Sequence, residues 1–312
     1  MDSLTQAALG ASIGKAFYKD SNKGAIAGAA IATLPDLDVI LYLFYDKIDM
    51  LSIHRGLSHS IAFSVLISLL LVFILKKSRW FEDSNYVRLL SFIWVVYFTH
   101  ILLDTFTTYG TQLLLPFSNY RFGFDSINVV DPVYTLPLLF GLILSLKKKG
   151  KINFNKWGLI ISSCYLIFTI FHKKHVNQVF KEKLRAEEID YSNLLTVPVG
   201  IANLNWYGVA KSTDSIYIQH YATFEGIPKP FEAFPINEKY MNELGDELAK
   251  TMRWFAKGFY TLEKEGSIIR VYNLQVDMRG IISSNGKKAP TKGYFLVEKI
   301  EGKTNFSSGS WE

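Results

Sequence analysis

Long apolar segments constrain this chain most, because about 17–25 consecutive apolar residues are enough for a helix to cross a bilayer. Five segments of the 312-residue sequence approach that length, the last of them being short: Gly24–Phe44, Leu57–Leu75, Leu89–Phe106, Val129–Leu146 and Trp157–Phe171. An apolar stretch rich in alanine and glycine, Leu4–Phe17, precedes them and suits close helix packing. We therefore expect an all-α polytopic membrane helical bundle of about five spans plus an N-terminal helix.

The composition favours a membrane protein over a soluble enzyme. Hydrophobic residues make up 49% of the chain and aromatic residues 15%, and the mean hydropathy is +0.14. The net charge is +6, but the lysines are concentrated at the ends of apolar runs, where basic residues set the membrane topology. We therefore expect no nucleic-acid partner. The single cysteine, Cys164, lies inside an apolar run, which excludes a disulfide framework and a cysteine zinc site.

The sequence changes character after Lys173, where charges become frequent and apolar runs shorten. Strand-like runs, one of them with clear period-two alternation, cover Ile216–Tyr221, Ser267–Asp277 and Gly293–Ile300. Apolar residues recur at helical spacing in Asn237–Lys257. We therefore expect two domains, a membrane-embedded domain over residues 1–172 and a small soluble α+β domain over residues 173–312.

Basic residues gather in the loops on one side of the expected bundle. They are Lys15, Lys19 and Lys23 before the first span, Lys76, Lys77, Arg79 and Arg88 after the second, and Lys147, Lys148, Lys149, Lys151 and Lys156 after the fourth. The opposite loops hold only Lys47, Arg55 and Arg121. Because basic loops stay in the cytoplasm, we expect a multi-pass protein of the bacterial inner membrane with its C-terminal domain on the periplasmic side.

Three clusters of metal-ligand residue types lie at the ends of the apolar segments: LPDLD at 34–38, HRGLSH at 54–59 and HILLD at 100–104. Ionisable side chains at membrane depth cost several kcal/mol unless they are paired or metal-bound. In the expected topology all three clusters and Asp131 meet at the outer leaflet. His100 and Asp104 are four residues apart, so they share one face of a helix. The sequence thus predicts a membrane-embedded metal site near the outer surface.

The candidate residues divide by chemical role. The expected metal ligands are Asp36, Asp38, His54, His59, His100 and Asp104. His54 and Asp131 are each either a ligand or a general base of the catalytic centre. Arg55, which we also count among the catalytic residues, and Arg121 are expected to hold substrate charge.

Each cluster alone also has a simpler interpretation. His100 and Asp104 could form a surface ion pair, the DxD could be a turn, and His54 could simply face water. Together, three His and four Asp on one side of a bundle exceed the three protein ligands of a catalytic zinc site, and the surplus permits two metals. We expect a divalent cation, first of all zinc, as one to three ions, while manganese and iron also suit such ligands.

Two local features shape these clusters. Pro35 is poorly suited to a helix interior, so it is expected to break or kink the first span. If the segment after it is extended, Asp36 and Asp38 face the same side. Ser58 is a candidate N-cap for the second span.

Five sequence blocks, in this order, carry a family resemblance over about residues 1–172: MDSLTQAALGASIG, LPDLD, HRGLSHS, HILLDTFTTYGTQLLLPFS and VVDPVYTLPLL. The chain resembles the inner-membrane metal-dependent hydrolases of the YdjM type, also labelled LexA-binding. That family is distantly similar to the zinc-dependent phospholipase C and nuclease superfamily, which implies an all-helical core with His/Asp-bound zinc ions. Many members carry His where this chain has Gln6, and an amide is the weaker ligand, so we do not expect Gln6 to bind zinc.

We therefore expect a membrane-bound hydrolase that uses metal-activated water on a phosphoester, such as a lipid headgroup, at the outer face of the inner membrane. Membrane lipid would be both its environment and a candidate substrate. The alternative is a non-enzymatic membrane protein, either a metal transporter or a regulatory or structural partner. A transporter would place ligands near the bilayer midplane, often within internal repeats, and the sequence has neither feature. The oligomeric state does not follow from the sequence.

Overall fold

The computed structural model describes residues 1–78, 80–147, 153–225, 230–276, 278, 280–284, 287–300 and 303–311. The chain divides into two compact units, each with its own hydrophobic core. The helical unit comprises Met1–Leu41 and Ile53–Ile170, and the sheet unit comprises Tyr42–Ser52 and Phe171–Glu312. Several residues named in the sequence-based predictions lie outside the described residues: Arg79, Lys148, Lys149, Lys151 and Asp277.

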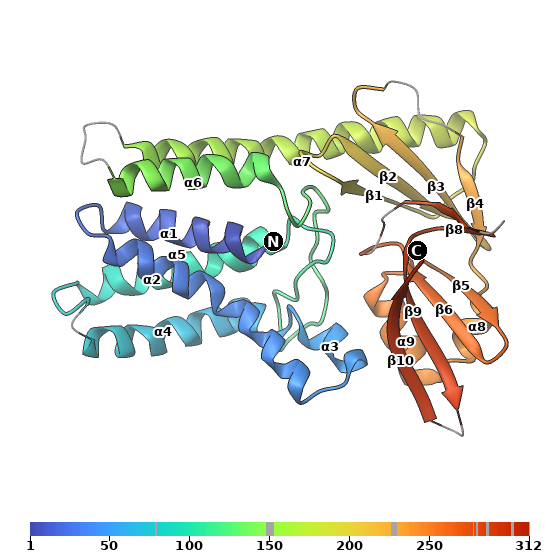
Figure 1. Ribbon diagram of the computed structural model, residues 1–312, viewed down its shortest axis with the longest axis horizontal. Coiled ribbons are helices and arrows are strands. Elements are labelled where there is room, and N and C mark those ends of the chain that lie inside the picture. Colours follow the sequence, from blue (N-terminus) through green and yellow to red (C-terminus); the bar gives the residue numbers. More distant parts are fainter. Residues whose placement is uncertain are drawn as a thin grey trace. The chain divides into compact units, whose positions relative to one another are not determined.

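The described helices of the helical unit follow the apolar segments closely (Figure 1). They are α1 (Ser3–Phe17), α2 (Lys23–Thr33), the 3-10 helices η1 (Pro35–Leu43) and η2 (Leu57–His59), α4 (Ile61–Lys77), α5 (Tyr86–Asp104), α6 (Pro132–Lys147) and the first part of α7 (Phe154–Ala186). Short polar side chains begin several of them: Asp2 accepts a hydrogen bond from Thr5 N, and Ser60 accepts one from Phe63 N. Ser60, and not the predicted Ser58, therefore caps α4.

The prediction of about five membrane spans is wrong. Among the described residues, two helices, α5 and α7, are long and apolar enough to cross a bilayer. The number rises to at most four if the bent pairs α2 with η1, and Lys47–His59 with α4, each form one span. The segment predicted as Val129–Leu146 becomes α6, whose 16 residues extend roughly 24 Å, short of a hydrocarbon core of about 30 Å.

A break at Pro35 separates α2 from η1, as the sequence predicts. The two helices are bent by 45° relative to each other. Proline lacks the backbone N–H and clashes with the preceding turn, so α2 ends at Thr33. The segment that follows is a 3-10 helix and not the extended strand considered above. Asp36 and Asp38 both lie in the first turn of this 3-10 helix, and Asp38 is the more buried of the two.

Glycines bring α1 and α2 into backbone contact. A Cβ atom added to Gly10 would lie 2.3 Å from the carbonyl oxygen of Gly28, and one added to Gly14 would lie 1.9 Å from that of Gly24. No side chain fits at these distances, so the sequence requires glycine at this crossing. The close packing holds α1 in the core of the helical unit, where α1 also contacts α5 and α6.

The sheet unit is a large β-rich region, so the prediction of a small α+β domain after an all-α bundle is wrong as well. Its described strands form three antiparallel sheets, in the orders β1-β2-β3-β4, β10-β9-β6-β5 and β7-β8 (Figure 1). The first sheet comprises β1 (Asn193–Val199), β2 (Asn205–Lys211), β3 (Ser215–Ala222) and β4 (Glu232–Pro235). The second comprises β5 (Tyr260–Glu265), β6 (Ile268–Asn273), β9 (Gly293–Ile300) and β10 (Lys303–Ser310), and the third β7 (Ile282–Ser284) and β8 (Lys287–Ala289).

The described part of the sheet unit also contains the second part of α7 and three short helices. They are α3 (Lys47–Ile53), most of which belongs to this unit, α8 (Glu238–Asn242) and α9 (Asp246–Phe255). The single predicted helix Asn237–Lys257 is thus divided in two, with Gly245 at a positive φ of 93° directly before α9. A residue other than glycine is strained at that angle, which explains the position of the division.

Candidate metal centre

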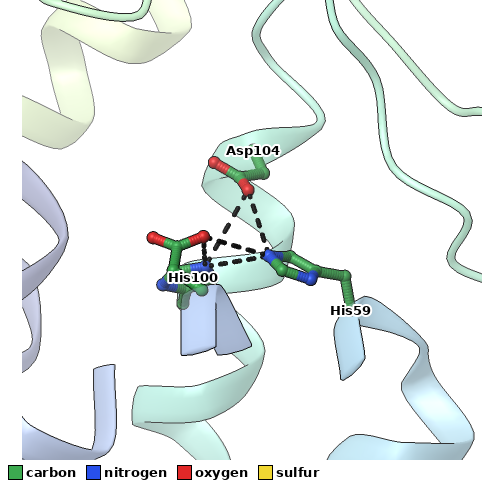
Figure 2. Close-up of side chains that lie close together, drawn as sticks. His59, His100 and Asp104 are labelled. Carbon is green, nitrogen blue, oxygen red and sulfur yellow. Dashed lines mark hydrogen bonds and ion pairs between the residues drawn. The ribbon is translucent and has the colours of Figure 1, made fainter. Parts of the chain in front are cut away.

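Four side chains from three segments of the helical unit meet in one place. Asp36 comes from η1, His59 from the end of η2, and His100 and Asp104 from the last turn of α5. One nitrogen or oxygen atom from each lies within 4.8 Å of the other three. Figure 2 shows His59, His100 and Asp104 pointing toward one another. We call these four residues the metal group.

The spacing inside the metal group fits one ion. The Nε2 atoms of His59 and His100 are 3.3 Å apart, and Asp36 Oδ1 lies 3.4 and 3.5 Å from them. Asp104 Oδ2 lies 3.5 Å from His59 Nε2 and 3.8 Å from His100 Nε2. Four tetrahedral ligands at about 2.0–2.1 Å from a zinc ion are separated from each other by roughly 3.3 Å. Five of the six separations between ligand atoms, at 3.3–3.8 Å, are therefore close to those around a tetrahedral ion, and all six are within 4.8 Å.

Hydrogen bonds to the other ring nitrogens orient both histidines. His100 Nδ1 lies 2.6 Å from the carbonyl oxygen of Ala32, which can only accept, so this nitrogen carries the proton. His59 Nδ1 lies 2.9 Å from Ser58 Oγ and 3.4 Å from Asp38 Oδ2. A proton on Nδ1 leaves the lone pair on Nε2, the nitrogen that faces the metal group. This pairing of a ligating imidazole with an oxygen acceptor is common around bound metals.

Asp104 supplies the strongest indication that a cation belongs here. Its Oδ1 accepts a hydrogen bond of 3.1 Å from Gln6 Nε2 and is also contacted by the amino group of Met1. Its Oδ2 is buried, faces the metal group, and accepts no hydrogen bond from the described residues, although Arg55 Nε lies 3.1 Å away. A buried carboxylate oxygen without hydrogen bonds is costly. Two imidazoles and two carboxylates suit zinc, manganese or iron, so the residues present fit a divalent ion.

Access to the metal group is from the side of Asp36. The side chains of His59, His100 and Asp104 are 0–1% exposed, whereas that of Asp36 is 24% exposed. Asp36 follows the break after α2, His59 immediately precedes α4, and Asp104 is the last residue of α5. The metal group thus lies at one end of the helices, next to the point where the chain leaves them.

Two further predicted ligands, Asp38 and His54, lie next to the metal group but are not part of it. Asp38 Oδ1 is 2.9 Å from His54 Nδ1, and its Oδ2 accepts hydrogen bonds from Arg55 N at 3.0 Å and Ser58 Oγ at 3.1 Å. These contacts turn the Asp38 carboxylate toward the outer nitrogen of His59. In this geometry Asp38 contacts a candidate ligand from the side away from the metal group, and its own role as a ligand stays a prediction.

Asp131, predicted as a ligand or general base, is placed elsewhere. Its Oδ1 accepts hydrogen bonds from the backbone N–H groups of Val133 at 2.9 Å and Tyr134 at 3.4 Å, and its Oδ2 accepts one from Tyr165 at 2.8 Å. The carboxylate therefore satisfies the first free N–H groups of α6 in the manner of an N-cap. These contacts account for its complete burial without any role in metal binding.

Both predicted substrate-binding arginines are buried and share a neighbour. The guanidinium of Arg55 lies 5.0 Å from the ring centre of Tyr109, and that of Arg121 lies 4.6 Å from it. Arg55 also donates a hydrogen bond of 2.7 Å to Thr107 Oγ1. We did not predict roles for Thr107 and Tyr109 from the sequence. The available signal was their position in TFTTYG, directly after the metal-ligand motif HILLD.

The family model for YdjM inner membrane protein matches residues 1–176, more than half of the chain. The chain belongs to the YdjM inner membrane protein family. All four residues of the metal group lie within the matched region. The family and the apolar helices place the protein in the inner membrane.

Two relatives are similar to this chain over part of its length. Inner membrane protein YbcI of Escherichia coli (strain K12) is 39% identical over 98 residues, which cover 31% of this chain and 55% of the relative. Uncharacterized protein YfhP of Bacillus subtilis (strain 168) is 30% identical over 141 residues, which cover 42% of each. The chain thus spans about half the length of these relatives. No solved structure matches.

Proposed function

We propose that this YdjM-family protein is a metal-dependent hydrolase that cleaves a phosphoester at the outer face of the inner membrane. The observation that carries the proposal is the metal group, because its four ligand atoms lie within 4.8 Å of one another and one of them, Asp104 Oδ2, is a buried carboxylate oxygen that accepts no hydrogen bond from the described residues. A divalent ion held by Asp36, His59, His100 and Asp104 would supply a water of lowered pKa and polarise the bond under attack.

The chain's own residues prepare this site for hydrolysis. Ser58 Oγ at 2.9 Å and the more distant Asp38 carboxylate at 3.4 Å hold Nδ1 of His59 in place, and the Ala32 carbonyl holds that of His100, so both Nε2 atoms stay directed at one point. His54 uses Nδ1 to contact Asp38, which leaves Nε2 as the position that accepts or donates a proton. The side chain of His54 is 23% exposed, so a substrate can reach it. In this arrangement His54 is the candidate acid or base.

The position of the metal group along the helices supports action at the membrane surface. Asp104 ends α5 and His59 immediately precedes α4. The opposite ends of the same two helices carry Lys76, Lys77 and Arg88. Because basic residues next to spans remain in the cytoplasm, the metal group would lie at the periplasmic end. A phosphoester in a lipid headgroup lies at this depth, which makes membrane lipid the first substrate to test.

A test begins with the metal content of the protein purified in detergent without chelator, followed by phosphate-ester release from phospholipid vesicles. We expect about one or more divalent ions per chain in the wild type, and loss of both metal and hydrolysis in Asp104→Asn. The matched control is Asp20→Asn, which changes an exposed aspartate of the same unit.

The same experiments separate the enzyme from the alternatives considered from the sequence. A protein that binds metal, hydrolyses none of a panel of phosphoesters and carries metal ions across vesicle membranes would be a transporter. A protein without metal and without hydrolysis would point to a structural or regulatory role. A reporter fused after Glu312 that is active only in the cytoplasm would contradict the proposed orientation.

A further inference from the structure

Arg55 is a buried cation whose hydrogen-bonding capacity is largely unused. The residue is 6% exposed, and a guanidinium offers five N–H donors. Nη1 donates to Thr107 Oγ1, while Nε faces Asp104 Oδ2 but makes no hydrogen bond of normal geometry. Within the described part of the chain, Nη2 donates no hydrogen bond either. Of these two donors Nε is the buried one, and buried donors are nearly always satisfied, which indicates that a ligand or water completes the site.

A second buried cation, Arg121, lies close to Arg55. It is 3% exposed and donates a hydrogen bond to the carbonyl oxygen of Tyr109, whose ring both guanidinium groups contact. Both centres lie within 5.0 Å of the same ring centre, so the two positive charges are about 10 Å apart at most. Burial lowers the pKa of Arg121 to about 10, and the charge of Arg55 acts in the same direction, with Asp125 opposing it.

Two buried guanidinium groups suit a tetrahedral oxyanion by their charge and by their N–H donors. Guanidinium groups bind phosphate oxygens through paired N–H donors, with a geometry that lysine cannot offer. An anion on Arg55 would also relieve the repulsion between the two buried positive charges. Because Arg55 Nε is 3.1 Å from the Asp104 oxygen that faces the metal group, this anion would lie next to the ion.

We infer that Arg55 and Arg121, whose guanidinium groups both contact the Tyr109 ring, form a phosphate subsite beside the metal group. The inference deepens the proposed function and rests on it in one respect, namely that the bound phosphate is the phosphoryl group of the ester to be cleaved. Arg55 contacts Asp104 through Nε and would bind the phosphoryl group through its other N–H donors, so it would place that group next to the metal. Tyr109 is a positioning residue, since it contacts the arginines and not the ester in this arrangement.

The test measures binding of inorganic phosphate to the detergent-purified, zinc-loaded protein by isothermal titration calorimetry. We expect Arg121→Gln to weaken phosphate binding at least about tenfold, as loss of a charge-assisted hydrogen-bonding partner does. Arg121→Lys should recover only part of this loss, because lysine lacks the paired donors. Zinc content should stay unchanged in both variants, since Arg121 is not one of the four residues of the metal group.

The matched control is Arg88→Gln. Arg88 also stacks on a tyrosine of the helical unit, with its guanidinium 4.9 Å from the ring centre of Tyr18, but it lies at the opposite end of α5. Phosphate binding should be unaffected by this change. Arg55→Gln serves as a second variant and should weaken binding as much as Arg121→Gln, and its thermal unfolding midpoint shows whether the altered protein is folded.

A competition experiment identifies the source of the phosphoryl group. Displacement of inorganic phosphate by nanodiscs that contain phosphatidic acid, but not by phosphatidylcholine nanodiscs, would assign the subsite to a lipid headgroup. Displacement only by soluble phosphomonoesters would assign it to a soluble substrate. Either result supports the subsite.

Failure of the inference and failure of the proposed function give different results. Wild-type phosphate binding that is equally strong in Arg121→Gln and in a folded Arg55→Gln would overturn the subsite, whether or not the protein hydrolyses esters. Arginine-dependent phosphate binding in a protein that hydrolyses no ester would leave the subsite intact and reject the hydrolase.

Discussion

Asp38 Oδ2 lies 3.4 Å from Nδ1 of His59, on the side of the imidazole ring that points away from the metal group. His59 thus connects a carboxylate to the candidate ion through its two nitrogens. The same carboxylate contacts His54, so one side chain orients a metal ligand and a candidate acid or base together. A carboxylate of this kind fixes the ring and raises the basicity of the ligating nitrogen.

The Asp38→Asn variant tests whether Asp38 orients a ligand or is itself one. We expect zinc affinity to fall by about 10–100-fold while binding persists, because the four ligands of the metal group remain. Competition against a zinc chelator of known affinity measures the change. Complete loss of zinc, equal to that in His100→Ala, would instead make Asp38 a direct ligand, as the sequence first suggested.

Asp131 offers the opposite case, a predicted site residue with a structural task. Asp131→Ala should lower the free energy of unfolding by about 1 kcal/mol, because the N–H groups of Val133 and Tyr134 lose their acceptor. Asp131→Asn should recover most of this stability, since asparagine also caps helices well. Zinc content should equal that of the wild type in both variants. A loss of zinc in Asp131→Asn would contradict the capping role and return Asp131 to the metal site.

The candidate site could be predicted in part because it depends on local spacing. The separation of His100 and Asp104 by four residues already places both on one helix face. The sequence does not reveal which nitrogen of His59 points inward, and therefore could not separate the candidate ligand Asp36 from its neighbour Asp38. Asp131 carried an overlooked signal, since an aspartate directly before Pro132 is typical of a helix start.

The fold was harder to predict because a hydropathy pattern gives the length of an apolar run, and the helix that forms within the run can be shorter. The run Val129–Leu146 loses its first residues to the loop before Pro132, so α6 is too short for a span. In the sheet unit, β1 buries the consecutive residues Leu195–Pro198 and so lacks the alternation that identified β6. Pro198 also argues against a central strand, and β1 is indeed at the edge of its sheet.

The crossing of α1 and α2 should be intolerant of any side chain. Gly14→Ala places a Cβ atom 1.9 Å from the carbonyl oxygen of Gly24, and backbone cannot move aside as a flexible side chain would. We expect a loss of about 1–3 kcal/mol in stability, measured as a lower thermal unfolding midpoint in detergent. Gly123→Ala is the matched control, because its added Cβ would have its nearest neighbours at an ordinary 3.4 Å. Equal midpoints for the two variants would show that the helices separate at little cost.

Removal of the metal should loosen the helical unit, because the ion would join segments that are far apart in sequence. Asp36 belongs to η1, His59 to η2 and Asp104 to α5, and without a cation the buried carboxylate of Asp104 and the partly exposed carboxylate of Asp36 lie together beside two imidazoles. An ion present at about a thousand times its dissociation constant stabilises the folded state by roughly 4 kcal/mol. Chelation should therefore lower the thermal unfolding midpoint by several degrees, and added zinc should restore it. Asp104→Asn should unfold at one temperature with or without chelator. A wild-type midpoint that does not respond to chelator or zinc would mean that the four side chains are held together by their own hydrogen bonds and not by an ion.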